Sequence, residues 1–105
     1  MPETISIYDL NNKLTKKEQC QIIDVREVPE YESARIAGSK LIPLSVFEQN
    51  ISKINSDASS YFLCGVGKRA ARAAEYLESI GYKNLYVIDG GIKAWIEAGF
   101  PVEQG

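Results

Sequence analysis

The sequence contains no histidine among its 105 residues. This absence excludes Cys-His and Ser-His-Asp catalytic arrangements, and it excludes metal sites that depend on an imidazole ligand. Any nucleophile in the chain must therefore react without an imidazole base. Attack by a preformed thiolate on an electrophilic sulfur meets this condition, because the nucleophile is already deprotonated and the leaving group departs as an anion.

Long apolar runs and an excess of basic charge are also missing. No stretch reaches the roughly 18 consecutive apolar residues of a membrane span, and the start Met1-Pro2-Glu3-Thr4 lacks the pattern of a signal peptide. We therefore expect a cytoplasmic protein without membrane contact. The net charge of -2 and the pI near 5.1 disfavour a general nucleic-acid binder.

Cysteine is scarce, with only Cys20 and Cys64 in the chain. The two do not form a Cys-x-x-Cys motif, and disulfides are uncommon in a reducing cytosol, so we expect both thiols to be free. Cys20 is interpreted as a small apolar residue that enters a strand. The length of 105 residues suits one domain over residues 1–105, and we expect a monomer.

The segment Cys64-Gly65-Val66-Gly67-Lys68-Arg69 is the most informative feature that is present. It follows the apolar run 61–63 and precedes the helix-favouring run 70–77, which places one thiol on a glycine-bearing loop between a strand and a helix. Such a loop turns backbone N-H groups inward, and the helix adds partial positive charge, so a thiolate would be stabilised there. The positive charges of Lys68 and Arg69 would further stabilise the thiolate if these side chains turn toward the sulfur. The pattern predicts an activated cysteine in an open polar site, with sulfur transfer through a persulfide as the natural chemistry, in preference to a buried structural thiol.

Five short apolar segments alternate with helical patterns along the chain. We expect strands at 5–7, 20–25, 40–42, 60–63 and 84–88, and helices at 8–17, within 26–33, at 45–54, 68–80 and 92–96. Ser45 and Glu48 form a predicted capping box for the third helix, and Gly81 is expected to end the fourth. This alternation predicts an α/β fold with a mostly parallel sheet covered on both faces. Ligands of such sheets bind beyond the carboxyl ends of the strands, where Cys64 is expected.

Several other residues invite a chemical interpretation that we weigh against a structural one. Asp24 and Arg26 are expected to be structural, with the Asp accepting from backbone amides of the next turn. Arg69 is expected to function or to brace the loop by pairing with a carboxylate such as Glu27. Trp95 is expected to pack the last helix on the sheet with its N-H near water. The pair at 90–91 is interpreted as a turn, because no Gly-x-Gly-x-x-Gly motif surrounds it.

Several ordered segments together resemble the rhodanese homology domain in its small single-domain form. They are 23–27 with 30–31, then 35–39 leading to 42–44, then the six-residue loop 64–69, and finally 89–95. The resemblance implies a three-layer α/β/α fold with a five-stranded parallel sheet. It also implies that Cys64 takes a sulfane sulfur from thiosulfate or a persulfide and passes it to cyanide, a thiol or a protein cysteine. The implied cradle for the substrate is formed by Gly65, Val66, Gly67, Lys68 and Arg69, and no metal or organic cofactor is implied.

Two positions depart from the pattern of many relatives. Arg35 stands where they have histidine, and the sequence leaves open whether it takes over a role of that residue. Gly65 stands where they have an arginine beside the cysteine, which removes one anion ligand. Lys68 offers only a point charge in place of a bidentate guanidinium. We therefore expect modest affinity for thiosulfate, and a persulfide is an equally good candidate donor.

Two other classes of function remain open. Cysteine phosphatases and arsenate reductases share the general loop design but place five residues between cysteine and arginine, whereas four separate Cys64 from Arg69 here. The shorter loop predicts a smaller pocket, suited to one sulfur atom. A non-catalytic module or a sulfur relay to another protein's cysteine is the second class, and a relay needs the same persulfide as an enzyme.

Overall fold

A computed structural model describes residues 2–105 and shows a five-stranded sheet. The strands are β1 (Glu3–Ile5), β2 (Gln21–Asp24), β3 (Lys40–Leu41), β4 (Ser60–Leu63) and β5 (Leu85–Ile88). Their order is β1-β5-β4-β2-β3, and each pairing between them is parallel. The predicted α/β class and parallel sheet are confirmed. Since β4 is the central strand, the residue that follows it lies in the middle of the carboxyl edge.

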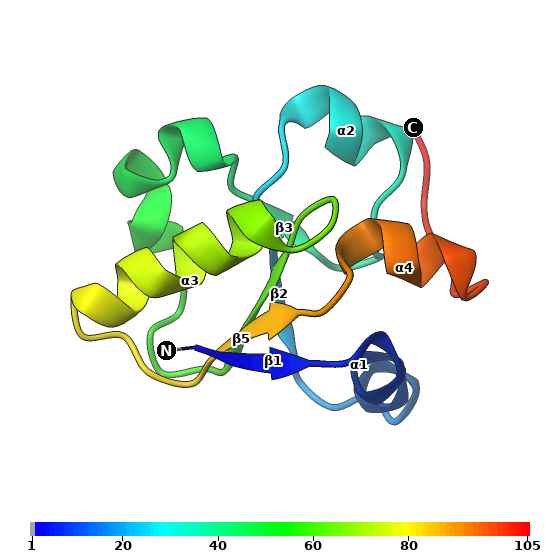
Figure 1. Ribbon diagram of the computed structural model, residues 1–105, viewed down its shortest axis with the longest axis horizontal. Helices are drawn as coiled ribbons and strands as arrows, with labels where there is room; N and C mark the ends of the chain where they lie inside the picture. Colours follow the sequence, from blue (N-terminus) through cyan, green and yellow to red (C-terminus); the bar gives the residue numbers. More distant parts are fainter. Residues whose placement is uncertain (1) are drawn as a thin grey trace.

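Helices cover both faces of this sheet and make three layers (Figure 1). Helices α1 (Ile7–Thr15) and α4 (Gly91–Glu97) lie on one face. Helix α3 (Lys68–Ser79) and the 3-10 helices η1 (Leu44–Val46) and η2 (Glu48–Lys53) lie on the other, and α2 (Val28–Ser33) follows β2. Successive strand residues point to opposite faces, so Phe62 packs with the α3 layer while Leu63 packs with α1 and α4. Both faces are buried, which explains why the strand segments are apolar throughout.

The first helix begins one residue earlier than predicted, and the first strand ends two residues earlier. Ser6 was expected inside a strand over 5–7, but its Oγ accepts a hydrogen bond from the backbone N-H of Asp9 at 3.0 Å. This side-chain cap satisfies a donor that the first helical turn cannot pair, so the helix begins at Ile7 and β1 ends at Ile5. The hydrogen bond of the Ser6 side chain therefore starts the helix at Ile7, although the strand propensity of Ile7 favours an extended backbone.

The single helix predicted over 45–54 is wrong. Two 3-10 helices, η1 and η2, take its place, and Ser45 lies inside η1 with its hydroxyl donating to Oε1 of Glu27 at 2.9 Å. The hydroxyl is thus engaged by another element and does not cap a helix. Phe47 and Ile54 are buried, whereas Val46 is 40% exposed. Phe47 and Ile54 therefore pack into the core although the backbone forms the i-to-i+3 hydrogen bonds of 3-10 helices and not those of an α-helix.

The ends of the later helices follow the predicted chemistry more closely. Gly81 directly follows the C-cap of α3 and has a φ of 101°, as expected for a glycine that ends a helix. Trp95 is 1% exposed on α4, and its indole N-H donates to the carbonyl of Pro101 at 2.8 Å. The C-terminal segment then runs beside α2, where Arg35 pairs with Glu103 in an antiparallel bridge (Figure 1). Across residues 2–105, no helix combines the length and apolar character that a membrane crossing requires.

Candidate active site

Cys64 lies directly after β4, and its sulfur is held by the first turn of α3. The Sγ accepts hydrogen bonds from the backbone N-H groups of Gly67, with N···Sγ at 3.0 Å, and Ala70, at 3.3 Å. Gly67 is the N-cap of α3 with a φ of 115°, and it has no side chain that could cap the helix. The thiol of Cys64 therefore takes the place of a capping side chain, and it meets the positive end of the helix dipole.

The loop encloses its sulfur more completely than the sequence indicated. An open polar site was expected, yet Cys64 is only 1% exposed and belongs to the hydrophobic cluster that also contains Phe62 and Ala70. Within the range 65–69 that was predicted to cradle the sulfur, only Gly67 has an amide hydrogen bond to it, and the second donor is Ala70 just beyond that range. Lys68 is exposed at the start of α3, and Val66 is 57% exposed at the tip of the loop. The helix predicted over 68–80 places Ala70 at its third position. The backbone N-H there has no partner within the helix, so the sequence could have predicted Ala70 as a second donor to the sulfur.

Helix α4 supports the same loop from its other side. The backbone N-H of Ile92 donates to the carbonyl of Cys64 at 2.9 Å, and that of Lys93 donates to the carbonyl of Gly65 at 3.2 Å. A Cβ on Gly91 would lie only 2.4 Å from each of these carbonyl oxygens. Gly91 was interpreted as part of a turn, but it also lets α4 approach the loop this closely. The carbonyls of Cys64 and Gly65 thus accept hydrogen bonds from α4. The N-H groups of Gly67 and Ala70, which follow in the chain, donate to the sulfur.

Arg69 pairs with a carboxylate as expected, and the partner is Glu30, one turn beyond the example Glu27. Its Nη1 and Nη2 donate to the two carboxylate oxygens of Glu30 at 2.8 and 2.9 Å. This bidentate contact lowers the pKa of Glu30 to about 2 and raises the pKa of Arg69. Glu27 instead accepts from the Ser45 hydroxyl, and its backbone N-H donates to Glu30. The spacing of Glu27 and Glu30 at the start of α2 is that of a capping box, and it is the sequence signal that could have singled out Glu30.

Asp24 and Arg26 form a buried ion pair behind this contact. Asp24 is fully buried and Arg26 is 4% exposed, with Arg26 Nη2 at 2.8 Å from Asp24 Oδ2. The carboxylate also accepts from the Arg26 backbone N-H, as predicted. The guanidinium further donates to the carbonyls of Glu30 and Ala34, at 3.2 and 2.6 Å. The structural interpretation of the pair is confirmed, and its role is to hold α2, and with it Glu30, against the carboxyl end of β2.

The remaining singled-out residues lie away from the sulfur. Arg35 donates to the carbonyl of Tyr31, stacks on its ring and pairs with Glu103. Cys20 is a free, half-buried thiol just before β2, at the opposite end of the sheet from Cys64. In residues 2–105, no three His, Cys, Asp or Glu side chains are grouped as a metal ion would require.

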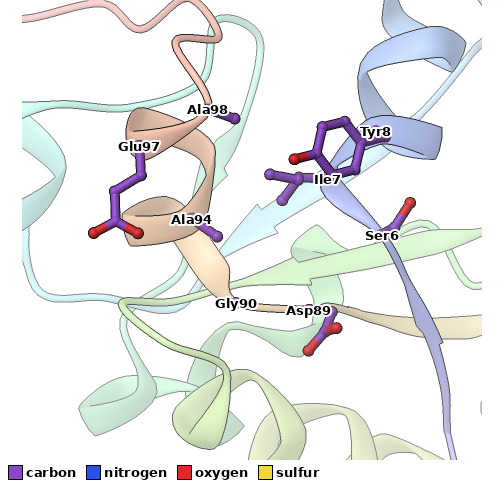
Figure 2. Close-up of a pocket in the computed structure, with 8 residues that line it drawn as sticks. All are labelled: Ser6, Ile7, Tyr8, Asp89, Gly90, Ala94, Glu97 and Ala98. Carbon is purple, nitrogen blue, oxygen red and sulfur yellow. The ribbon is translucent and has the colours of Figure 1, made fainter.

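A cavity of about 390 Å³ lies between the start of α1 and α4 (Figure 2). Figure 2 shows Ile7 and Tyr8 facing α4 across it, with Asp89 at its base and Glu97 on the helix. Neither cysteine lines it, and two carboxylates would repel an anionic sulfur donor. The cavity therefore does not extend the thiol site.

Comparisons with known proteins agree with this geometry. The model of the Rhodanese-like domain family matches residues 6–98. Rhodanese-like/PpiC domain-containing protein 12, chloroplastic, of Arabidopsis thaliana is 37% identical over 98 residues, which cover 87% of this chain and 33% of that protein. Thiosulfate sulfurtransferase GlpE of Pseudomonas putida is 29% identical over 91 residues, covering 87% of this chain and 82% of that protein.

A solved structure shows the same arrangement of elements. The crystal structure of a rhodanese-related protein from Thermoplasma volcanium superimposes with a TM-score of 0.89 at 32% identity, covering 98% of this chain and 99% of the other. The chain spans only 33%, 51% and 61% of the length of three curated relatives that it matches.

Proposed function

Because the chain belongs to the rhodanese-like domain family, we propose that it is a sulfurtransferase that carries a sulfane sulfur as a persulfide on Cys64. In the first step the Cys64 thiolate attacks the outer sulfur of the donor, a sulfur–sulfur bond forms, and the donor's own sulfur–sulfur bond breaks. Thiosulfate would leave as sulfite, and a persulfide would leave as a thiolate. In the second step an acceptor thiolate or cyanide attacks the outer sulfur, and the Cys64 thiolate departs.

The observation that carries this proposal is the pair of amide donors on one sulfur. Hydrogen bonds to a charged acceptor contribute about 1.5–3 kcal/mol each. The donors from Gly67 and Ala70, with the dipole of α3 behind them, would stabilise negative charge on the sulfur without a base. The amides of 65–69 are proposed to line the path of the donor, with Lys68 at its mouth. The closed loop favours donors that present one exposed sulfur atom.

A phosphatase or arsenate reductase is a weaker proposal for this site. Four residues separate Cys64 from Arg69, and the guanidinium is engaged by Glu30 outside the loop. A tetrahedral oxyanion would need several inward amides and a free guanidinium. A relay that hands the sulfur to another protein's cysteine fits the site as well as an enzyme does, since both use the same persulfide. The cytoplasm is the proposed location, because a free reactive thiol requires a reducing compartment.

Mass spectrometry after incubation with a sulfur donor tests the proposal. The protein is treated separately with thiosulfate and with the persulfide of 2-mercaptoethanol, and the intact mass is measured. We expect a gain of one sulfur atom that persists in Cys20→Ala and disappears in Cys64→Ala. Failure of both donors to add sulfur to the wild-type protein would refute a sulfurtransferase, and addition at Cys20 would refute the assignment of the nucleophile.

A further inference from the structure

Arg69 places a guanidinium against the loop that holds the nucleophile. An ideal Cβ built on Gly65 would lie 3.2 Å from Arg69 Nη2, so this nitrogen sits beside the residue that follows Cys64. The side chain of Arg69 is 37% exposed and that of Glu30 is 40% exposed, so the contact lies at the surface of the loop. An anionic donor that approaches the loop on this side therefore meets the Arg69–Glu30 pair.

Glu30 occupies the edge of the guanidinium that an oxyanion would use. The two contacts of 2.8 and 2.9 Å take up Nη1 and Nη2 in the fork geometry with which arginine binds carboxylates, phosphates and sulfonates. The carboxylate also compensates the positive charge. Thiosulfate carries two negative charges at neutral pH, so it gains little from an arginine that is already paired.

Two further hydrogen bonds hold Glu30 in its position beside Arg69. Its Oε1 also accepts from the backbone N-H of Glu27 at 3.0 Å, and its carbonyl accepts from the buried guanidinium of Arg26. These contacts fix both the backbone and the side chain of Glu30 on α2. A donor would have to break a preorganised bidentate pair to recruit Arg69.

We propose that Glu30 is a positioning residue that determines donor specificity: it withholds Arg69 from oxyanionic donors and directs the loop toward persulfides of low charge. The inference rests on the proposed sulfur transfer. With a persulfide R-S-SH, the Cys64 thiolate forms a bond to the outer sulfur, and the sulfur–sulfur bond of the donor breaks. R-S⁻ leaves with the electron pair, and the transferred sulfur keeps its proton. No sulfonate has to be bound in that step.

The test compares the rate at which two donors load sulfur onto Cys64. One donor is thiosulfate and the other is the persulfide of 2-mercaptoethanol, whose leaving group carries no second charge. Glu30→Gln removes the charge and retains an amide oxygen for the Glu27 N-H. We expect this variant to load from thiosulfate about fivefold faster, the size of one exposed charge interaction, while loading from the persulfide changes by less than about twofold.

Three matched variants distinguish an effect of Glu30 on donor specificity from a purely structural effect of Glu30 on the loop. Glu30→Asp keeps the charge and should keep the donor preference of the wild-type protein, whereas Glu30→Ala should shift it in the same direction as Glu30→Gln. The double variant Glu30→Gln/Arg69→Gln should lose the gain with thiosulfate, because the freed guanidinium is what produces it.

The outcomes distinguish this inference from the sulfurtransferase proposal. An unchanged ratio of the two rates in folded Glu30→Gln, or an equal fall of both, would overturn the inference alone and leave Glu30 as a brace. No loading of the wild-type protein by either donor would overturn sulfur transfer, and the inference with it.

Discussion

Gly91 is the position where a single methyl group most directly tests how α4 shapes the loop. The residue has a φ of 62°, and an added Cβ would lie 2.4 Å from the carbonyl oxygens of Cys64 and Gly65. Real Cβ contacts are essentially never shorter than 3.0 Å, so in Gly91→Ala the carbonyls must retreat by at least the difference, 3.0 − 2.4 = 0.6 Å. That movement would stretch the hydrogen bonds from Ile92 and Lys93 and displace the loop around the sulfur.

The expected loss of stability has two parts. Forcing an extra methyl into a packed site costs about 1–3 kcal/mol. A side chain in the left-handed region adds roughly 1–2 kcal/mol. Gly99 isolates the second part, since it has a φ of 81° and nothing lies within 4 Å of its ideal Cβ. We therefore expect Gly91→Ala to lower the free energy of unfolding by about 2–5 kcal/mol and Gly99→Ala by only about 1–2 kcal/mol.

Urea unfolding and ultraviolet absorbance of the thiolate provide the two measurements. The thiolate signal is the absorbance of each protein minus that of its Cys64→Ala counterpart at neutral pH. Gly91→Ala should lower this signal because the loop moves, and Gly99→Ala should leave it unchanged. Equal stability losses in the two variants, together with an unchanged thiolate signal in Gly91→Ala, would refute the role assigned to α4.

Two further predictions concern the ion pairs that hold α2. Arg26→Met leaves Asp24 buried without its partner and should lower the free energy of unfolding in urea by about 3–5 kcal/mol. Adding Asp24→Asn should restore part of this stability. A loss below about 1 kcal/mol in Arg26→Met would contradict the buried pair. Arg69 holds the pKa of Glu30 at about 2 against an ordinary 4.5, so the pair stabilises the fold fully above pH 4.5 and progressively less as the pH falls toward 2. Exposure keeps that contribution below about 1 kcal/mol, and Glu30→Gln should flatten the pH dependence of stability in this window; an unaltered profile would show that the pair is not maintained in solution.

Local sequence patterns predicted the sheet and the thiol loop because both depend on signals carried by neighbouring residues. The apolar runs are short enough for strands, and their alternation with helical segments requires parallel pairing. The glycines around Cys64, followed by the alanine-rich run, mark a strand-to-helix turn whatever the rest of the fold. The same local reasoning placed Gly81 at the end of α3, and the structure confirms it.

Long-range contacts account for two of the differences between prediction and structure. The hydroxyl of Ser45 was expected to cap a helix, but Glu27 lies close enough in space to accept its hydrogen bond. Arg69 was expected to pair with a carboxylate such as Glu27, and the structure shows that the partner is Glu30 of the α2 capping box. Each difference concerns a polar side chain with more than one partner in reach, which sequence spacing cannot rank.

The sequence by itself determined that the chain has a parallel α/β sheet and a cysteine at a strand-to-helix loop, because periodicity and turn chemistry act over a few neighbouring residues. Tertiary structure alone decided which groups surround that cysteine. The second amide donor, the support from α4 and the Glu30–Arg69 pair join segments that are brought together only when the sheet closes its order β1-β5-β4-β2-β3. Hydrogen bonds and ion pairs are short-ranged in space, and their partners are therefore set by packing and not by distance along the chain.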